Sequence, residues 1–120
     1  MNRYVIQGLL GDLVYRKRQI VFTSGIAMAR RSVHELMLDE LHSYRWGYSL
    51  ERMTEDSIEF RKGGRIFFVP FEARALEGQR ADVWAIYKPN VPLVKFDAAM
   101  AVIRCEAQRT TPNAEIIRLD

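Results

Sequence analysis

The sequence predicts an α/β protein, a small three-layer sandwich in which a mostly parallel sheet with one β-hairpin is flanked by helices. Two observations lead to this prediction. Short apolar runs alternate along the chain with longer segments whose apolar residues recur at helical spacing, and a Gly-Gly pair separates two neighbouring β-rich runs. A chain of 120 residues is large enough to bury one core, so we expect a single domain over residues 1–120.

The first part of the chain predicts a helix, a strand and a second helix. Apolar residues within residues 2–16 have the spacing of one helical face, and residues 19–23 form an apolar run typical of a buried strand. Ser24 and Gly25 then turn the chain into a helix predicted over residues 26–44. The expected core face of this second helix consists of Val33, Leu36, Met37, Leu38 and Leu41.

The β-hairpin is predicted from residues 57–61 and 65–69, two β-rich runs on either side of the Gly63-Gly64 pair. Pro, Gly and Asn residues divide the rest of the chain into short segments. The remaining predicted elements are a loop or short helical turn over residues 70–79, a strand over 82–87, a helix over 98–107 and a last strand over 115–119.

Composition is that of an ordinary globular protein, with 48% apolar and 28% charged residues. The apolar run over residues 5–14 is interrupted by polar residues and is too short to span a bilayer, so we expect no membrane contact and a cytoplasmic location. The single cysteine, Cys105, cannot form an internal disulfide, and we expect it to be a small core-facing residue.

A formal net charge of +3 permits contact with nucleic acid without requiring it. If the hairpin turn and the start of the long helix project from one end of the molecule, their basic side chains would contact phosphates without reading bases. An ordinary solvated surface is the equally weighted alternative. The eight candidate residues are Arg16, Lys17, Arg18, Arg30, Arg31, Arg61, Lys62 and Arg65. Three aromatic residues, Tyr44, Trp46 and Tyr48, either stack on bases or, as we prefer for Trp46 and Tyr48, anchor their loop on the core.

The sequence gives little support for a metal site or a catalytic nucleophile. His34 and His42 lie about two helical turns apart, too far to share a metal ion. We expect His34 to form a surface pair with Glu35. No Gly-x-Ser-x-Gly elbow occurs, and Cys105 has no histidine near it in sequence, so we expect no metal site and no nucleophilic centre.

Three segments, taken in order, carry a resemblance to a known family. Residues 21–31 read VFTSGIAMARR, a strand that ends in Thr-Ser before a helix bearing arginines. Residues 58–68 read IEFRKGGRIFF, which predicts a hairpin. Residues 76–87 read LEGQRADVWAIY, in which a glycine and an arginine precede an apolar strand. Residues 19–119 thereby resemble the ATPase core of a phage large terminase, the DNA-packaging motor, and more loosely a helicase-like P-loop fold. The resemblance implies a truncated P-loop NTPase-like fold.

The departures from the family pattern concern its catalytic residues. The family's Walker B strand ends in an Asp that holds Mg²⁺ and an acid that orients water, and these degenerate positions carry Tyr87 and Lys88 here. No Gly-x4-Gly-Lys-Ser/Thr phosphate loop occurs. A damaged loop over residues 25–32, with Arg30 and Arg31 at the Gly and Lys positions, would bind nucleotide weakly at best, and we prefer an ordinary helix start. We therefore expect no enzymatic activity and no cofactor.

The resemblance also implies a strand order. The strands at residues 19–23, 82–87 and 115–119 would lie side by side, and a phosphate-loop strand would cover the last of them. The chain begins too close to its first predicted strand to supply that cover. Because open strand edges are templates for pairing, we expect the strand Glu115–Leu119 to be covered by the N-terminal helix, to pair with another protein chain or to pair with its own copy.

Three function classes follow. The first is a non-catalytic, terminase-like binding or assembly module, phage-encoded and linked to DNA packaging or virion assembly, located in the host cytoplasm or the virion. The second is a nucleic-acid-binding accessory protein that contacts phosphates through its basic clusters. The third is an active nucleotide hydrolase. An open strand edge with dimerisation favours the first class, a continuous basic face the second, and a phosphate bound at residues 25–32 the third.

Overall fold

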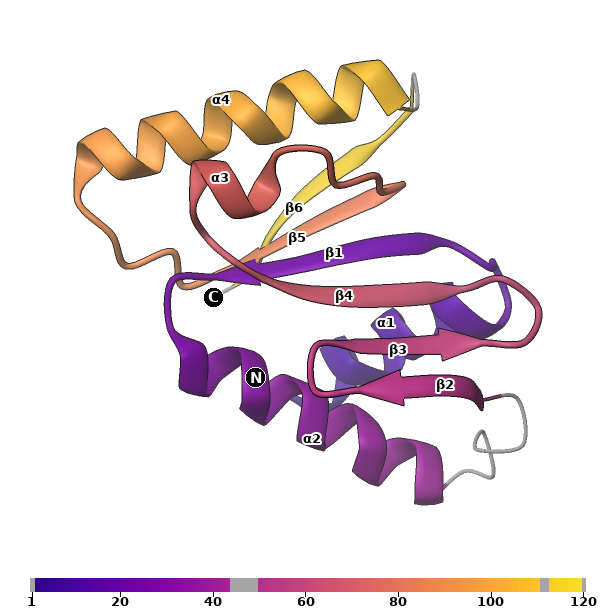
Figure 1. Cartoon of the computed structure of the whole chain (residues 1–120). Coiled ribbons are helices and arrows are strands. Elements are labelled where there is room, and N and C mark those ends of the chain that lie inside the picture. Colours follow the sequence, from indigo (N-terminus) through magenta and orange to yellow (C-terminus); the bar gives the residue numbers. More distant parts are fainter. Residues whose placement is uncertain (1, 44–49, 111–112, 120) are drawn as a thin grey trace.

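A computed structural model describes residues 2–43, 50–110 and 113–119 of the chain. In chain order the elements are α1 (Arg3–Val14), β1 (Gln19–Ser24), α2 (Ala27–Ser43), β2 (Leu50–Thr54), β3 (Ser57–Phe60), β4 (Arg65–Pro70), α3 (Ala73–Leu76), β5 (Val83–Tyr87), α4 (Leu93–Thr110) and β6 (Glu115–Leu119). The strands form one sheet in the order β2-β3-β4-β1-β5-β6 (Figure 1). Neighbours from β4 to β6 are parallel, whereas β2, β3 and β4 pair antiparallel. The predicted α/β class, the mostly parallel sheet and the hairpin are confirmed.

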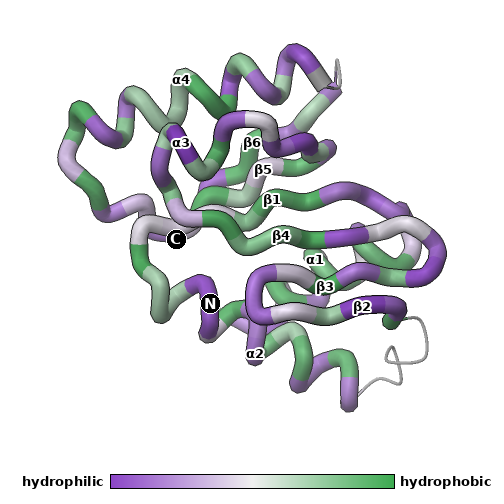
Figure 2. Tube along the Cα trace, viewed as in Figure 1, coloured by the Kyte–Doolittle hydropathy of each residue, from purple (hydrophilic) through white to green (hydrophobic). Residues whose placement is uncertain are grey.

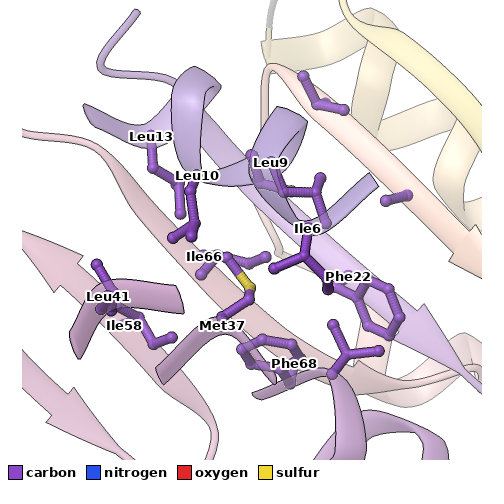
Figure 3. Packing of buried hydrophobic residues seen from close by; sticks show 14 of the residues in the cluster. Ile6, Leu9, Leu10, Leu13, Phe22, Met37, Leu41, Ile58, Ile66 and Phe68 are labelled. Atoms are coloured by element: carbon purple, nitrogen blue, oxygen red, sulfur yellow. The ribbon is translucent and has the colours of Figure 1, made fainter. Parts of the chain in front are cut away.

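Helices cover both faces of the sheet, as the sandwich prediction required. Helices α1 and α2 lie on one face, and α3 and α4 lie on the other (Figure 1). The α1 side chains point into the first core and meet residues from the strands and from α2 (Figure 3). The labelled members of this core are Ile6, Leu9, Leu10, Leu13, Phe22, Met37, Leu41, Ile58, Ile66 and Phe68.

The central strands divide their side chains between two cores. In β1, Val21 belongs to the core under α3 and α4, and the next residue, Phe22, belongs to the core under α1 and α2. All five residues of β5 are buried, including Trp84. A parallel strand covered on both faces reads as a continuous apolar run, which is why the sequence located β1 and β5 correctly. The apolar colouring along β1 and β4 in Figure 2 shows the same feature.

Two glycines permit close backbone approaches at opposite ends of the sheet. A Cβ added to Gly64, in the β3–β4 turn, would overlap the backbone of Leu13 at the end of α1. A Cβ added to Gly25, between β1 and α2, would overlap the carbonyl oxygen of Pro89 after β5. At both positions the turn needs glycine because the neighbouring chain leaves no space for a side chain.

Two elements differ from their predicted form. The edge strand β2 was not predicted, because residues 50–54 read LERMT and show no clear apolar alternation. Helix α4 begins at Leu93, before the predicted start at residue 98, and it ends at Thr110. Leu93 and Val94 are exposed, so the helix begins before the apolar stripe from which it was predicted.

Three side-chain predictions are wrong. Leu36 was assigned to the core face of α2 but is 40% exposed. His34, expected to pair with Glu35 on the surface, is buried. Its Nε2 lies 2.8 Å from the carbonyl oxygen of Thr54, and its ring meets Phe68 edge-on. Cys105, expected to face the core, is exposed on α4.

Among the described helices, none combines the length with the hydropathy that is needed to cross a membrane.

Candidate functional site

Tyr87 and Lys88, the two residues that the resemblance aligns with the Walker B acids, lie at and just after the end of β5. Tyr87 is only 7% exposed, and its ring centroid is 6.1 Å from that of Phe22 in the first core. The next residue, Lys88, is exposed, has a left-handed backbone with a φ of 40°, and places its Nζ 5.2 Å from the Tyr87 ring centroid. These positions hold a packed aromatic ring and a cation over it, so neither offers a carboxylate to a metal ion or to water.

The segment over residues 25–32 has the geometry of a helix start. The backbone N–H of Ile26 donates to the Ser24 Oγ, and Gly25 packs against the backbone of Pro89. The Nη1 of Arg30 donates to the carbonyl oxygen of Ser24 over 2.7 Å. Arg30 therefore holds the end of β1, and the amide of Ile26 is already engaged within the turn instead of pointing toward a phosphate.

The eight basic candidates divide between the two ends of the sheet. Because β1 and β4 are parallel, the loop before β1 and the turn before β4 meet at the end where both strands begin (Figure 1). The backbone N–H of Arg65 donates to the carbonyl oxygen of Arg18 over 3.1 Å. Arg30 and Arg31 instead follow the other end of β1, at the start of α2. The condition that the hairpin turn and the start of α2 share one end is therefore wrong.

The six residues that do gather are called the basic end, and they are Arg16, Lys17, Arg18, Arg61, Lys62 and Arg65. Two of them are paired, since Arg18 lies 3.2 Å from the Glu115 carboxylate and Arg16 lies 3.6 Å from that of Asp12. Lys17, Arg61 and Lys62 are exposed and have no ion pair within the described residues. This surface therefore retains unneutralised positive charge.

The last strand of the sheet, β6, has an open edge. It pairs with β5, and the backbone N–H of Glu115 donates to the Asp82 carbonyl oxygen. Because the N–H and C=O of one residue point to the same side and successive residues alternate, those of Ile116 and Arg118 point away from β5. No described strand lies beyond them, and Ile116 is 42% exposed.

The charged side chains of β6 are engaged within the chain. Glu115 pairs with Arg18, and the Arg118 guanidinium lies 5.5 Å from the ring centroid of Phe96. Charged side chains at a sheet edge normally discourage pairing with another strand, but these two contact other elements of the same chain. The edge is left with two outward-facing backbone units and the exposed side chain of Ile116.

Helix α1 lies beside β6 over one face of the sheet. A groove of about 490 Å³ lies between them, lined by the apolar residues Val5, Leu9, Ile117 and Leu119 together with Asp12, Tyr15 and Arg16. The α1 helix therefore meets the face of β6, while Ile116 and Arg118 on the strand remain exposed. Of the three fates expected for this strand, cover by the N-terminal helix applies to its face and not to its outer edge.

The opposite edge of the sheet is built differently. In β2 the register shifts between Leu50 and Arg52, which marks a bulge, and residues 51–54 are all exposed. Arg52 reaches the Glu59 carboxylate at 4.0 Å. A bulge combined with exposed charges is how proteins blunt an edge strand against pairing.

Other chemistry is sparse in the described part of the chain. No group of three or more His, Cys, Asp or Glu side chains is placed to hold a metal ion there. The cavity beside His34 carries mixed charge, with Arg30 and Arg31 facing Glu35 and the acids of the β2–β3 turn. The aromatic candidates Tyr44, Trp46 and Tyr48 lie outside the described residues.

No protein-family model matches this chain, and comparison with the curated proteins finds no match. Functional assignment therefore rests on the open edge, the basic end and the cavities of the molecule.

Lys95 lies in the first turn of α4 and lines a cavity at the end of the sheet where the parallel strands finish. It was not among the predicted site residues, because the helix was predicted to begin after it.

Proposed function

We propose that this chain is a non-catalytic assembly module that joins a second copy of itself through the edge of β6. The absence of carboxylates at Tyr87 and Lys88 supports the non-catalytic part of the proposal. The side-by-side order of β1, β5 and β6 agrees with what a terminase-like fold implies. A role in phage DNA packaging or virion assembly rests on that resemblance alone.

The observation that carries the proposal is the contrast between the two sheet edges. At β2 a bulge and exposed charges oppose pairing, whereas β6 is regular along its pairing with β5. Its unpaired backbone groups, on Ile116 and Arg118, lie next to an exposed apolar side chain and an apolar groove. Backbone groups of this kind gain hydrogen bonds when a further strand adds to the edge.

A second copy fits this edge because two-fold pairing places no like charges opposite each other. In an antiparallel pair centred on Ile117, the outward-facing Ile116 of each copy lies opposite Arg118 of the other. Glu115 then lies opposite Leu119, so no like charges face each other directly. Ile117 meets its own counterpart on the face that carries the α1 groove, and the apolar surface becomes continuous across the two copies.

The test is light scattering of the purified protein at two concentrations, with matched lysine substitutions at the two edges. Ile116 and Met53 are comparably exposed apolar residues, at 42% and 48%, on β6 and β2 respectively. We expect a dimer for the unmodified protein and for Met53→Lys, and a monomer for Ile116→Lys. All three proteins should give the same circular dichroism spectrum.

A proline scan sharpens the result. Ile116→Pro removes an N–H that points outward, so it should abolish the dimer and leave the β5–β6 ladder intact. Ile117→Pro removes an N–H that faces β5 and should destabilise the fold itself. A monomer at high concentration for the unmodified protein, or a dimer that survives both substitutions at Ile116, would refute self-assembly through β6.

Contact with nucleic-acid phosphates is the second candidate function, because the structure gathers six of the eight predicted cations at the basic end. Exposed lysines and arginines contact phosphates without reading sequence. The corresponding test is binding of mixed-sequence duplex DNA at several salt concentrations. Affinity should fall steadily as salt rises, since bound cations release counterions from the DNA. Undetectable or salt-insensitive binding would remove this candidate.

A further inference from the structure

A cavity of about 550 Å³ lies at the end of the sheet where the parallel strands finish. It is bounded by the segment that enters α2, by α3 and by the first turns of α4 (Figure 1). It is separate from the β6 edge and from the basic end. Its size falls within the range of about 300 to 1,000 Å³ that is usual for small-molecule sites.

The position of this cavity follows from the topology of the sheet. After β1 the chain passes to α2 on one face, whereas after β4 and β5 it passes to α3 and α4 on the other (Figure 1). Neighbouring strands whose connections diverge to opposite faces leave a crevice outside their carboxyl ends, and this is where open α/β sheets bind ligands.

Positive charge dominates the polar lining of the cavity. Arg30, Arg74 and Lys95 contribute cations, and Glu72 is the one acidic residue among the described lining residues. None of the three cations has an ion pair within the described part of the chain. The Nη1 of Arg30 is held by the carbonyl oxygen of Ser24, which fixes the guanidinium and leaves its other N–H groups to donate elsewhere.

The remaining wall of the cavity is apolar. Phe71 and Val91 line it, together with Pro70 and Ala98. Phe71 is buried, and its ring centroid lies 5.7 Å from that of Phe96, so this wall has a packed aromatic base. A cationic rim beside an apolar wall is complementary to a molecule that carries an anionic group on an apolar body.

We propose that this cavity binds a small organic anion, a phosphate or carboxylate group carried on an apolar or ring-shaped body. Arg74 and Lys95 hold the anionic group beside the fixed guanidinium of Arg30, and the body lies against Phe71 and Val91. The anion is held by side chains from three helices, which differs from a phosphate loop, where backbone amides supply the donors.

The test is calorimetric titration with four probes: 1-naphthyl phosphate, 1-naphthoate, neutral 1-naphthol and inorganic phosphate. Binding of either naphthyl anion, with naphthol and inorganic phosphate each much weaker, is the expected result and tells which anionic group the cavity accepts. Naphthol binding as tightly as the anions would overturn the proposal, and so would no binding of either anion.

Charge substitutions locate the binding. Arg74 and Lys95 are exposed, so Arg74→Gln and Lys95→Gln should fold normally, which an unchanged thermal midpoint checks. Each should weaken binding of the naphthyl anion about tenfold, because each removes a charge-assisted contact. Lys62→Gln, at the opposite end of the sheet, is the matched control and should bind unchanged. Equal affinity for all four proteins would show that the anion binds elsewhere and would overturn the proposal.

Discussion

At each end of the sheet a glycine packs against the backbone of a neighbouring segment, yet the two ends present surfaces of different shape. At the end where the parallel strands begin, Gly64 packs on the backbone of Leu13, and at the end where they finish, Gly25 packs on that of Pro89. The first end carries its cations outward on short loops as the basic end. The second end has a cavity among helix starts, with its cations around the rim.

The difference arises from how the chain leaves each end. Short loops enter β1 and β4 at the first end and lie against one another, which leaves Lys17, Arg61 and Lys62 exposed. Connections that diverge to both faces of the sheet leave space between them at the second end. An exposed cationic surface suits an extended phosphate backbone, whereas a lined cavity suits a small ligand.

The largest expected effect is that of Gly64→Ala. The added Cβ would overlap three backbone atoms of Leu13, which can move only if the end of α1 shifts. Denaturant titration should show a loss of about 3 kcal/mol in the free energy of unfolding, at the upper end of overpacking costs. Gly8→Ala is the matched control, because no atom lies near its added Cβ, and it should stabilise α1 by up to about 1 kcal/mol.

Gly25→Ala should cost somewhat less, about 2 kcal/mol, because its added Cβ would overlap the Pro89 carbonyl oxygen less closely than that of Gly64 would overlap the Leu13 carbonyl oxygen. The same substitution displaces a wall of the cavity, so it should also weaken binding of a naphthyl anion. Denaturant titration and calorimetry measure the two effects. Full stability together with full binding would show that the two loops do not approach as closely as described.

Polar clamps at the two ends provide the next comparison. At the first end, the Asp82 carboxylate accepts the backbone N–H of Gln19 over 2.9 Å, a charge-assisted bond. At the second end, the Ser24 hydroxyl accepts the N–H of Ile26 over 3.2 Å. Asp82→Ala should lower the free energy of unfolding by about 1.5 kcal/mol and Ser24→Ala by about 1 kcal/mol. The reverse order in denaturant titrations would show that charge adds nothing to the first clamp.

The smallest expected effects are on DNA binding, which should depend on the basic end and not on the cavity. Lys62→Gln at the basic end should weaken binding to duplex DNA roughly threefold and reduce its salt dependence by about one counterion. Lys95→Gln at the cavity removes the same charge and should leave DNA binding nearly unchanged. Fluorescence anisotropy at two salt concentrations measures both. An equal loss in the two variants would mean that net charge alone, and not the basic end, governs the interaction.

Much of the secondary structure was predictable because it depends on near neighbours. The last strand, Glu115–Leu119, was predicted with its observed bounds, and the hairpin followed from its Gly-Gly turn. The edge strand β2 was missed because four of its five residues are exposed and carry no apolar pattern. Its place in the sheet comes from backbone pairing with β3 instead of from burial.

The candidate sites were less predictable, because they depend on which distant segments meet. Nothing local indicates that the loop at residues 16–18 touches the turn before Arg65, or that Arg30 lies at the other end of the sheet. His34 was assigned to the surface because it stands beside Glu35 in the sequence, but β2 brings the Thr54 carbonyl oxygen to it. A cavity between three helix starts likewise has no signal in any single segment.

The sequence by itself determined the α/β class and the central apolar strands, because these depend on residue types and short-range periodicity. Only the tertiary structure decided which cations share an end, which edge of the sheet is open and where a ligand-sized space remains. Parallel pairing joins segments far apart in the chain, and the direction of each connection across the sheet decides whether an end is filled or hollow.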